Sequence, residues 1–147
     1  MPSFRHVLVA TDFSECSRTA EDMAATLAEK FGARLTVAHV FEPPVQYDAA
    51  IAYLPIDDLR DVASKSLDDE LARLRERAPK AERAFAMGTA WRELLGLVER
   101  AGADLVVVGT HGRRGVSRAL LGSVAEKIVR LSPVPVLTVH GSAERPK

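Results

Sequence analysis

Glycines at three fixed points of the chain could form a binding site for an anion. Gly109, Gly112 and Gly122 follow the spacing G-x2-G-x9-G-S, in which Ser123 is the serine. A glycine at the end of a strand allows a sharp turn, and its missing side chain lets backbone N–H groups approach an anion closely. Gly122 and Ser123 are predicted to open a helix, whose unpaired N–H groups and positive dipole end favour phosphate. The pattern therefore predicts a nucleotide site.

Charged and nucleophilic side chains give weaker signals. Arg113 lies inside the nine-residue spacer with Arg114 and Arg118, where a guanidinium could donate forked hydrogen bonds to phosphate oxygens or could simply be solvated. His111 lies in the same segment, without a paired carboxylate or nucleophile at a catalytic spacing. The four histidines and Cys16 show no metal-ligand spacing. We therefore predict neither a catalytic residue nor a metal site made of side chains.

Asp12, which follows the first apolar run, has two alternative roles. Its carboxylate could cap the next helix, because Asp and Ser near a helix start satisfy unpaired N–H groups. It could also meet a ribose hydroxyl or a metal ion, because a carboxylate beside a row of phosphates is otherwise repelled. The two roles do not exclude each other, and the second would bring Mg²⁺ with the nucleotide.

Length and composition favour one domain over residues 1–147 in a cytoplasmic protein. The 147 residues include 20 basic and 20 acidic side chains, so no overall field recruits nucleic acid or an anionic membrane. The single cysteine, Cys16, cannot form an internal disulfide, which suits a reducing compartment. The apolar run before Thr11 is too short for a signal peptide or a membrane span. We expect neither nucleic acid nor a membrane as a partner.

Short apolar runs alternate with longer segments of helical periodicity, which indicates a parallel sheet covered by helices. The five predicted strands span 6–10, 35–40, 84–87, 105–108 and 134–139. The predicted fold is α/β, a Rossmann-like open parallel sheet of five strands in the order 3-2-1-4-5, with helices on both faces.

Four helices are predicted between these strands. The first begins after Ser14 and stops at Gly32, and its apolar residues recur at intervals of three and four. Those residues are Ala20, Met23, Ala24, Leu27, Ala28 and Phe31. The others are predicted from about 59 to before Pro79, from about 89 to 100, and along the apolar positions Val124, Ile128 and Leu131.

In such a sheet, ligands bind beyond the carboxyl ends of the strands, where the strand order reverses. If the first and fourth strands are neighbours, three loops meet there: the one after strand one with Thr11 and Asp12, residues 40–44, and residues 109–123. Segment 42–55 contains three prolines and no sustained period, so we predict a loop that either folds over the nucleotide or is a mobile insertion.

Three stretches of the chain resemble the universal stress protein family. They are VLVATDFSE near the start, VAHVFEP at the end of the second predicted strand, and DLVVVGTHGRRGVSRALLGSVAEKIVRLSPVPVLTV. The resemblance covers nearly the whole chain, and in that family the G-x2-G-x9-G-S spacing marks the members that bind ATP. One departure is Ala10, where ATP-binding members often carry proline.

The resemblance implies roles for the matching positions. Asp12 would lie near the ribose or phosphates and any divalent metal, while Val40 would contact adenine and Thr11 would flank the base. The glycines would leave room around ribose and phosphates, and Ser123 and Val124 would present phosphate-binding groups. The implied nucleotide-binding set is Thr11, Asp12, Val40, Gly109, Thr110, Gly112, Arg113, Gly122, Ser123 and Val124.

The last predicted strand favours a homodimer. Pro133 and Pro135 suit an edge position, because proline cannot donate to a strand ladder. A bare apolar edge invites pairing with another chain, and members of the family that the chain resembles dimerise through this strand. We expect a two-fold dimer through Val136, Leu137, Thr138 and Val139.

These observations predict an ATP-binding universal stress protein that acts as a nucleotide-dependent stress-response or signalling module. Mg²⁺ would accompany ATP and be held mainly by the phosphates. One alternative is an interaction-only stress protein without nucleotide. The other is a slow ATPase or nucleotidyl-transfer enzyme of the wider adenine-nucleotide-binding α/β group, although neither an H-x-G-H nor an S-G-G-x-D motif occurs.

Overall fold

The apolar runs of the sequence form one parallel sheet in a computed structural model, which describes residues 3–44, 55–111 and 121–141. The strands are β1 (His6–Ala10), β2 (Arg34–Phe41), β3 (Glu82–Met87), β4 (Leu105–Gly109) and β5 (Val136–Val139). Their order is β3-β2-β1-β4-β5, and every neighbouring pair is parallel. The predicted α/β fold and strand order are confirmed.

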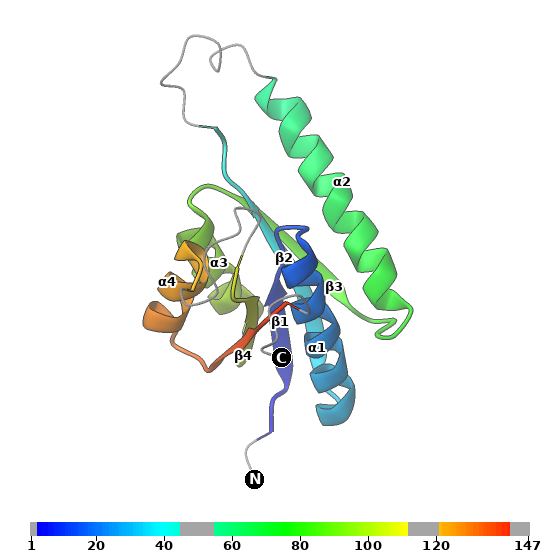
Figure 1. Ribbon diagram of the computed structural model, residues 1–147. Coiled ribbons are helices and arrows are strands. Elements are labelled where there is room, and N and C mark those ends of the chain that lie inside the picture. The colour runs from blue at the N-terminus through cyan, green and yellow to red at the C-terminus, as the bar shows by residue number, and fades with distance from the viewer. Residues whose placement is uncertain (1–2, 45–54, 112–120, 142–147) are drawn as a thin grey trace.

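Helices cover both faces of this sheet (Figure 1). They are α1 (Glu15–Phe31), α2 (Ile56–Arg75), α3 (Ala90–Ala101) and α4 (Ser123–Leu131). The pair α1 and α2 lies on one face, and the pair α3 and α4 lies on the other. Each helix joins two parallel strands, which is the connection that a parallel sheet requires.

The core has two halves because side chains alternate between the faces of a strand. Val7 and Val9 of β1 pack with the alanines of α1 and with Leu67 and Leu74 of α2. Leu8 of the same strand joins the other half, with side chains of α3 and α4. Central strands buried on both faces explain why their sequences are continuous apolar runs.

The first helix is apolar on a narrower face than its periodicity predicts. Ala20, Ala24 and Ala28 are buried, but Met23 and Phe31 are 42% and 41% exposed. Small alanines let α1 lie close against the sheet, so the larger side chains remain at its margins, and Phe31 packs edge-on against Phe4 with ring centroids 5.4 Å apart. On α4, Ile128 is buried whereas Leu131 is 46% exposed, so the predicted apolar face is again too wide.

Strand ends differ from the predictions by a few residues. The last strand begins at Val136 and not at 134, because the N–H and carbonyl of Val134 are hydrogen-bonded to the Ser132 hydroxyl and Pro135 has no N–H. The third strand begins two residues earlier than predicted, at Glu82. Among the described residues, no helix is long and apolar enough to span a membrane.

Candidate functional site

The predicted site residues come together at the carboxyl edge of the central strands. Thr11 and Asp12 follow β1, and Thr110 follows β4, the strand that pairs with β1. Thr11 N–H donates to the Ala38 carbonyl of β2 at 2.8 Å, so the turn after β1 remains attached to the next strand. The strand order reverses at β1, where ligands of open α/β sheets bind.

Hydroxyl groups fix the turn between β1 and α1. The Thr11 hydroxyl lies 3.1 Å from the Ser17 hydroxyl and accepts from Phe13 N–H at 3.1 Å. Asp12 Oδ1 accepts from Ser14 N–H at 3.0 Å, and Ser14 Oγ caps α1 by accepting from Ser17 N–H at 3.2 Å. Asp12 therefore shapes the turn, while Ser14 is the cap, as predicted.

The start of α4 is attached to the end of β4. Gly122 N–H donates to the Thr110 carbonyl at 2.7 Å, which places the first turn of α4 beside the carboxyl edge of the sheet. Gly122 is buried at the N-cap position and has no side-chain cap, in contrast to Ser14 on α1. Ser123 is exposed and Val124 is half-buried in the first turn. Backbone N–H groups with a positive dipole end therefore face this edge.

Val40 belongs to the face that α3 and α4 cover, where it packs with Ala10 against the core cluster of Leu8 and Val106. Its neighbours His39 and Phe41 point to the opposite face, because side chains alternate along β2. An adenine ring at Val40 would therefore lie on the α4 side of the sheet.

Buried polar residues continue along the same edge. Thr110 is 1% exposed, and its hydroxyl lies 3.3 Å from His111 Nδ1 and 3.4 Å from His140 Nδ1. Thr110 N–H donates to the Val139 carbonyl at 3.0 Å, which joins the ends of β4 and β5. Within the described ranges, no group of three or more histidine, cysteine, aspartate or glutamate side chains could hold a metal ion.

Two predicted site residues, Gly112 and Arg113, lie outside the described residues, as do Arg114 and Arg118 and most of the predicted loop 42–55. Their predicted roles remain predictions. The structure therefore brings together Thr11, Asp12, Val40, Gly109, Thr110, Gly122, Ser123 and Val124.

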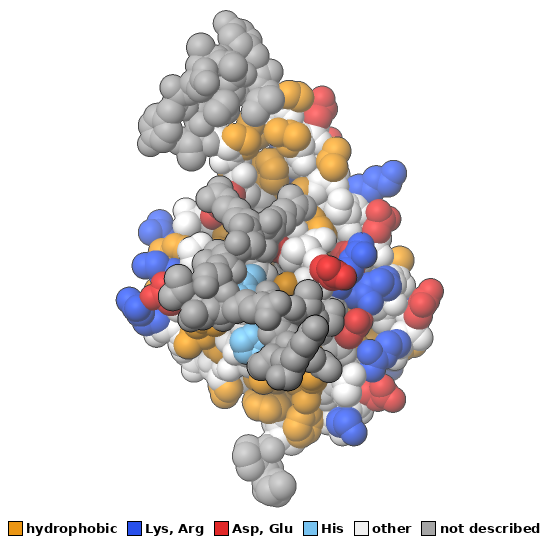
Figure 2. Space-filling model, viewed as in Figure 1, with side chains coloured by type: hydrophobic (Ala, Val, Ile, Leu, Met, Phe, Trp, Pro, Cys, Tyr) orange, Lys and Arg blue, Asp and Glu red, His pale blue; other side chains and the backbone are white. Residues whose placement is uncertain are grey.

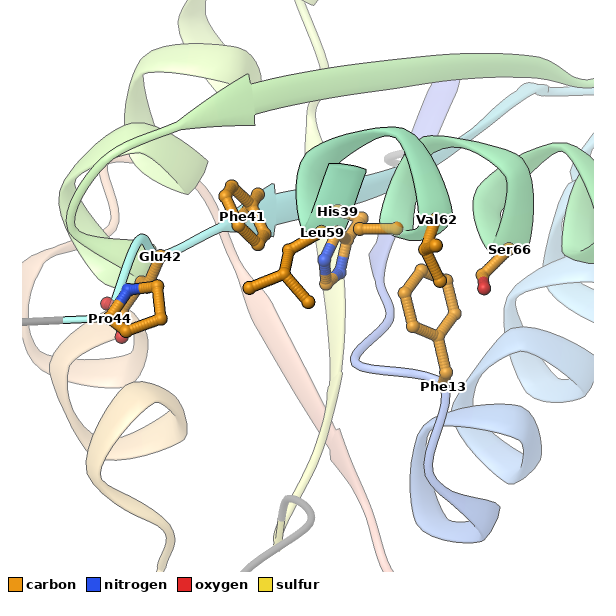
Figure 3. A pocket seen from close by; sticks show the side chains of 9 residues that line it. Phe13, His39, Phe41, Glu42, Pro44, Leu59, Val62 and Ser66 are labelled. Carbon is orange, nitrogen blue, oxygen red and sulfur yellow. The ribbon is translucent and has the colours of Figure 1, made fainter. Parts of the chain in front are cut away.

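An apolar cavity of about 230 Å³ lies on the opposite face, between the end of β2 and the first turns of α2 (Figure 3). Phe13 and His39 line one side of it, with ring centroids 4.4 Å apart and planes tilted by 35°, and Leu59 and Val62 of α2 line the other side. Phe13 has a φ of 68°. This left-handed backbone conformation is unusual for a bulky residue, and such conformations are found most often at functional sites.

The residue pattern alone predicted no role for Phe13 or Ser17. The density of Thr, Asp and Ser in TDFSECS is typical of a helix start and could have indicated Ser17. The left-handed backbone of Phe13 has no signal in its residue type.

Comparisons with known proteins agree with this geometry. A sequence profile described as the Universal stress protein family matches residues 3–140. The chain is 34% identical to the universal stress protein YxiE of Bacillus subtilis over 147 aligned residues, which cover 93% of this chain and 99% of the relative.

Solved structures share the fold. The universal stress protein UspA from Lactobacillus plantarum superposes with a TM-score of 0.81 at 20% identity, covering 95% of this chain and 99% of that one. A universal stress protein solved in complex with cAMP superposes with a TM-score of 0.69 at 27% identity, covering 96% of this chain and all of the other.

Proposed function

Because the chain belongs to the universal stress protein family, we propose that it is one of the members that bind ATP. The observation that carries the proposal is the start of α4, which has glycine and no side-chain cap at its N-cap position and is held beside Thr110 at the reversal point of the sheet. A helix start of this kind is a binding site for phosphate. The cAMP complex of a relative supports an adenine nucleotide as the ligand class.

The residues at this edge fit such a ligand. The N–H groups of Ser123 and Val124 would donate to phosphate oxygens, together with the exposed Ser123 hydroxyl. Asp12 would accept from a ribose hydroxyl while its Oδ1 holds the turn. Val40 would contact the adenine ring from β2, with Thr11 beside the base. Gly112 and Arg113 complete the proposed set from outside the described residues.

Mg²⁺ bound with the nucleotide would neutralise part of the phosphate charge near Asp12. We propose that it arrives with ATP, held mainly by the phosphates, because the carboxylate of Asp12 is already engaged in shaping the turn before α1.

We propose that the protein retains the nucleotide as a signal and does not turn it over rapidly. The described site offers backbone N–H groups, hydroxyls and one carboxylate, which are suited to holding phosphates in place. Transfer of a phosphoryl group depends on further positioned charges at the phosphates. We place this signalling role in the cytoplasm, since the single cysteine suits a reducing compartment.

A thermal-shift titration tests nucleotide binding. A ligand that binds only the folded state raises stability by RT ln(1 + [L]/Kd), about 2.7 kcal/mol at 100 times Kd. For a domain of this size we expect a rise in Tm of roughly 5–10 °C. Wild-type protein is titrated separately with ATP and Mg²⁺, AMP, and cAMP. No shift with any of them at millimolar concentration contradicts the proposal, and a shift with AMP or cAMP alone would contradict ATP as the ligand.

The variant Gly122→Val localises the site. Gly122 has φ −60° and ψ 155°, a conformation open to valine, so the change acts through the space that its side chain takes up. We expect the ATP-dependent shift in Tm to disappear. Gly96→Val on α3 is the matched control, because the atom nearest to an added Cβ there is the mobile Arg100 guanidinium. An equal ATP shift in both variants would move the site elsewhere.

A further inference from the structure

Charged side chains form a cluster between α1 and α2. Acidic and basic side chains gather over this side of the molecule in Figure 2. The cluster consists of Arg18, Glu21 and Asp22 from α1 and Glu70 and Arg73 from α2.

Arg73 uses all three of its guanidinium nitrogens in the cluster, two toward α1 and one toward Glu70 on its own helix. Nη2 lies 2.6 Å from Glu21 Oε2, Nη1 lies 2.7 Å from Asp22 Oδ1, and Nε lies 3.2 Å from Glu70 Oε2. Arg18 completes the cluster with its Nη2 2.9 Å from Glu70 Oε1. The connection between α1 and α2 therefore depends on the ionisation of these carboxyl groups.

The two glutamates of the cluster lie deeper than its two arginines. The Glu21 side chain is fully buried and that of Glu70 is 4% exposed, whereas Arg73 and Arg18 are 36% and 56% exposed. Water therefore screens the guanidinium charges but not the Glu21 carboxylate.

The fully ionised cluster carries an excess of negative charge. Three carboxylates and two guanidinium groups give a net charge of −1 when all are ionised. Within the described part of the chain, Glu21 Oε1 is buried and has no hydrogen-bond partner. Besides Arg73 and the Thr11 hydroxyl, Glu21 interacts with a second carboxylate, that of Glu70. A proton on Oε1 would remove the surplus charge and turn an unpaired acceptor into a donor toward Glu70.

We propose that Glu21 and Glu70 share one proton in the folded protein, so that the junction of α1 and α2 is a proton-binding site through which pH controls how firmly α2 is held. Thr11, which interacts with Glu21, also belongs to the proposed nucleotide site. The test below measures stability without nucleotide, so the proposal can fail separately from ATP binding.

The electrostatics of the pair agree with one shared proton. Burial, followed by the hydrogen bond with Glu70, raises the pKa of Glu21 to about 7, and the Thr11 hydroxyl and Arg73 act in the opposite direction. The pKa of Glu70 is lowered, because hydrogen bonds with Glu21, Arg18 and Arg73 outweigh the effect of burial. The proton therefore resides on Glu21.

Charged and polar side chains on the neighbouring elements influence the protonation of Glu21. Arg18 and Asp22 lie on the same helix as Glu21, and Glu70 and Arg73 lie on α2. Thr11 approaches from the end of β1. At the ends of β4 and β5, the titratable groups near α1 are His111 and His140, whose Nδ1 atoms lie 3.3 Å and 3.4 Å from the Thr110 hydroxyl.

The sign of the pH effect follows from the shift in pKa. Because Glu21 has a higher pKa in the folded state than its ordinary value of 4.5, its contribution to stability is complete below about pH 4.5. The contribution is lost as the pH rises through about 7. Over this window the folded state holds one proton more than the unfolded state, so the unfolding equilibrium constant rises by up to about tenfold per pH unit.

The variant Glu21→Gln tests the proposal, because its amide can donate to Glu70 and accept from Arg73 without titrating. Urea denaturation of the wild type and the variant at several values between about pH 5 and pH 8 gives the ratio of their unfolding constants. We expect similar stability near pH 5 and a variant more stable by roughly one to two orders of magnitude in that constant near pH 8. Comparing the two at each pH cancels the contribution of the histidines. Glu29→Gln on the exposed face of α1 is the matched control and should run parallel to the wild type.

If Glu21→Gln does not fold, a second variant and a direct titration of the wild type still test the proposal. Glu70→Gln removes the neighbouring negative charge, so the pH-dependent loss of stability should move to lower pH. In the wild type, the Glu21 carboxyl carbon should titrate by NMR with a midpoint near 7. Parallel profiles for the wild type and Glu21→Gln, an unmoved profile for Glu70→Gln, or a Glu21 midpoint below about 5 would each overturn the proposal.

Discussion

Gly109 lies against the first turn of α1. A Cβ built on it would lie 2.9 Å from Cys16 Sγ and 3.3 Å from the carbonyl carbon and oxygen of the same residue. Cys16 is buried, and its thiol lies 3.7 Å from the Val139 carbonyl. The close packing of Gly109 against Cys16 therefore explains why position 109 is glycine, whether or not a ligand binds. The role of Gly109 near the ribose remains a prediction.

At this position we expect Gly109→Ala to lower the free energy of unfolding by about 1–3 kcal/mol, since an added methyl group overpacks the contact with Cys16. In a Cys16→Ala background the sulfur is gone, so the same change should cost measurably less. A double-mutant cycle in urea denaturation gives the coupling, which we expect to exceed about 0.5 kcal/mol. Purely additive effects would show that the sulfur does not confine Gly109.

Helix starts differ in how their N–H groups are satisfied. On α1 the Ser14 side chain caps Ser17 N–H, and Gly32 closes the other end in the left-handed conformation, as the sequence predicts. On α3 Thr89 occupies the N-cap position without a side-chain hydrogen bond, and the Glu42 carboxylate accepts from Ala90 N–H instead. Residue type at a helix start therefore predicts where the helix begins better than which group caps it.

The two N-cap positions give a matched pair of substitutions. Ser14→Ala should lower the free energy of unfolding by about 1 kcal/mol, because Ser17 N–H loses its acceptor. Thr89→Ala should cost clearly less, because the Thr89 side chain makes no capping hydrogen bond. Chemical denaturation of both variants measures the difference. Equal losses of stability would mean that the Ser14 hydrogen bond contributes nothing beyond propensity.

For the whole molecule, the strand order leaves β5 at one edge of the sheet and β3 at the other. Val136, Leu137 and Thr138 are half-buried, so apolar surface accompanies the open backbone of β5. Unpaired strand edges are templates for another chain. We therefore propose the predicted two-fold dimer through β5, which would pair this strand with its copy.

Val136→Glu tests that dimer, since carboxylates brought close together across the two-fold axis would repel each other. We expect wild-type protein to have the mass of a dimer by light scattering and the variant that of a monomer. Met87→Glu at the opposite edge is the control, because Met87 is 49% exposed on β3. Melting curves check that both variants remain folded. A dimeric Val136→Glu protein would place the interface elsewhere.

The order of the elements was predictable from the sequence alone. Apolar runs such as 105–108 are typical of strands buried on both faces, and Ser14 and Gly32 mark the ends of α1 through local backbone chemistry. The spacing of the glycines also placed Gly122 correctly at the start of α4. These features depend on neighbours in the chain, so the residue types by themselves carry the information.

Only the tertiary structure decided which distant groups meet. The contact of Gly109 with Cys16, the left-handed Phe13 against His39, and the burial of Glu21 beside Glu70 join residues from different elements. In the sequence, Glu21 is one of many acidic residues on an amphipathic helix, and nothing local distinguishes it. Its shift in pKa arises because burial removes it from water and α2 brings a second carboxylate close, and these are properties of packing.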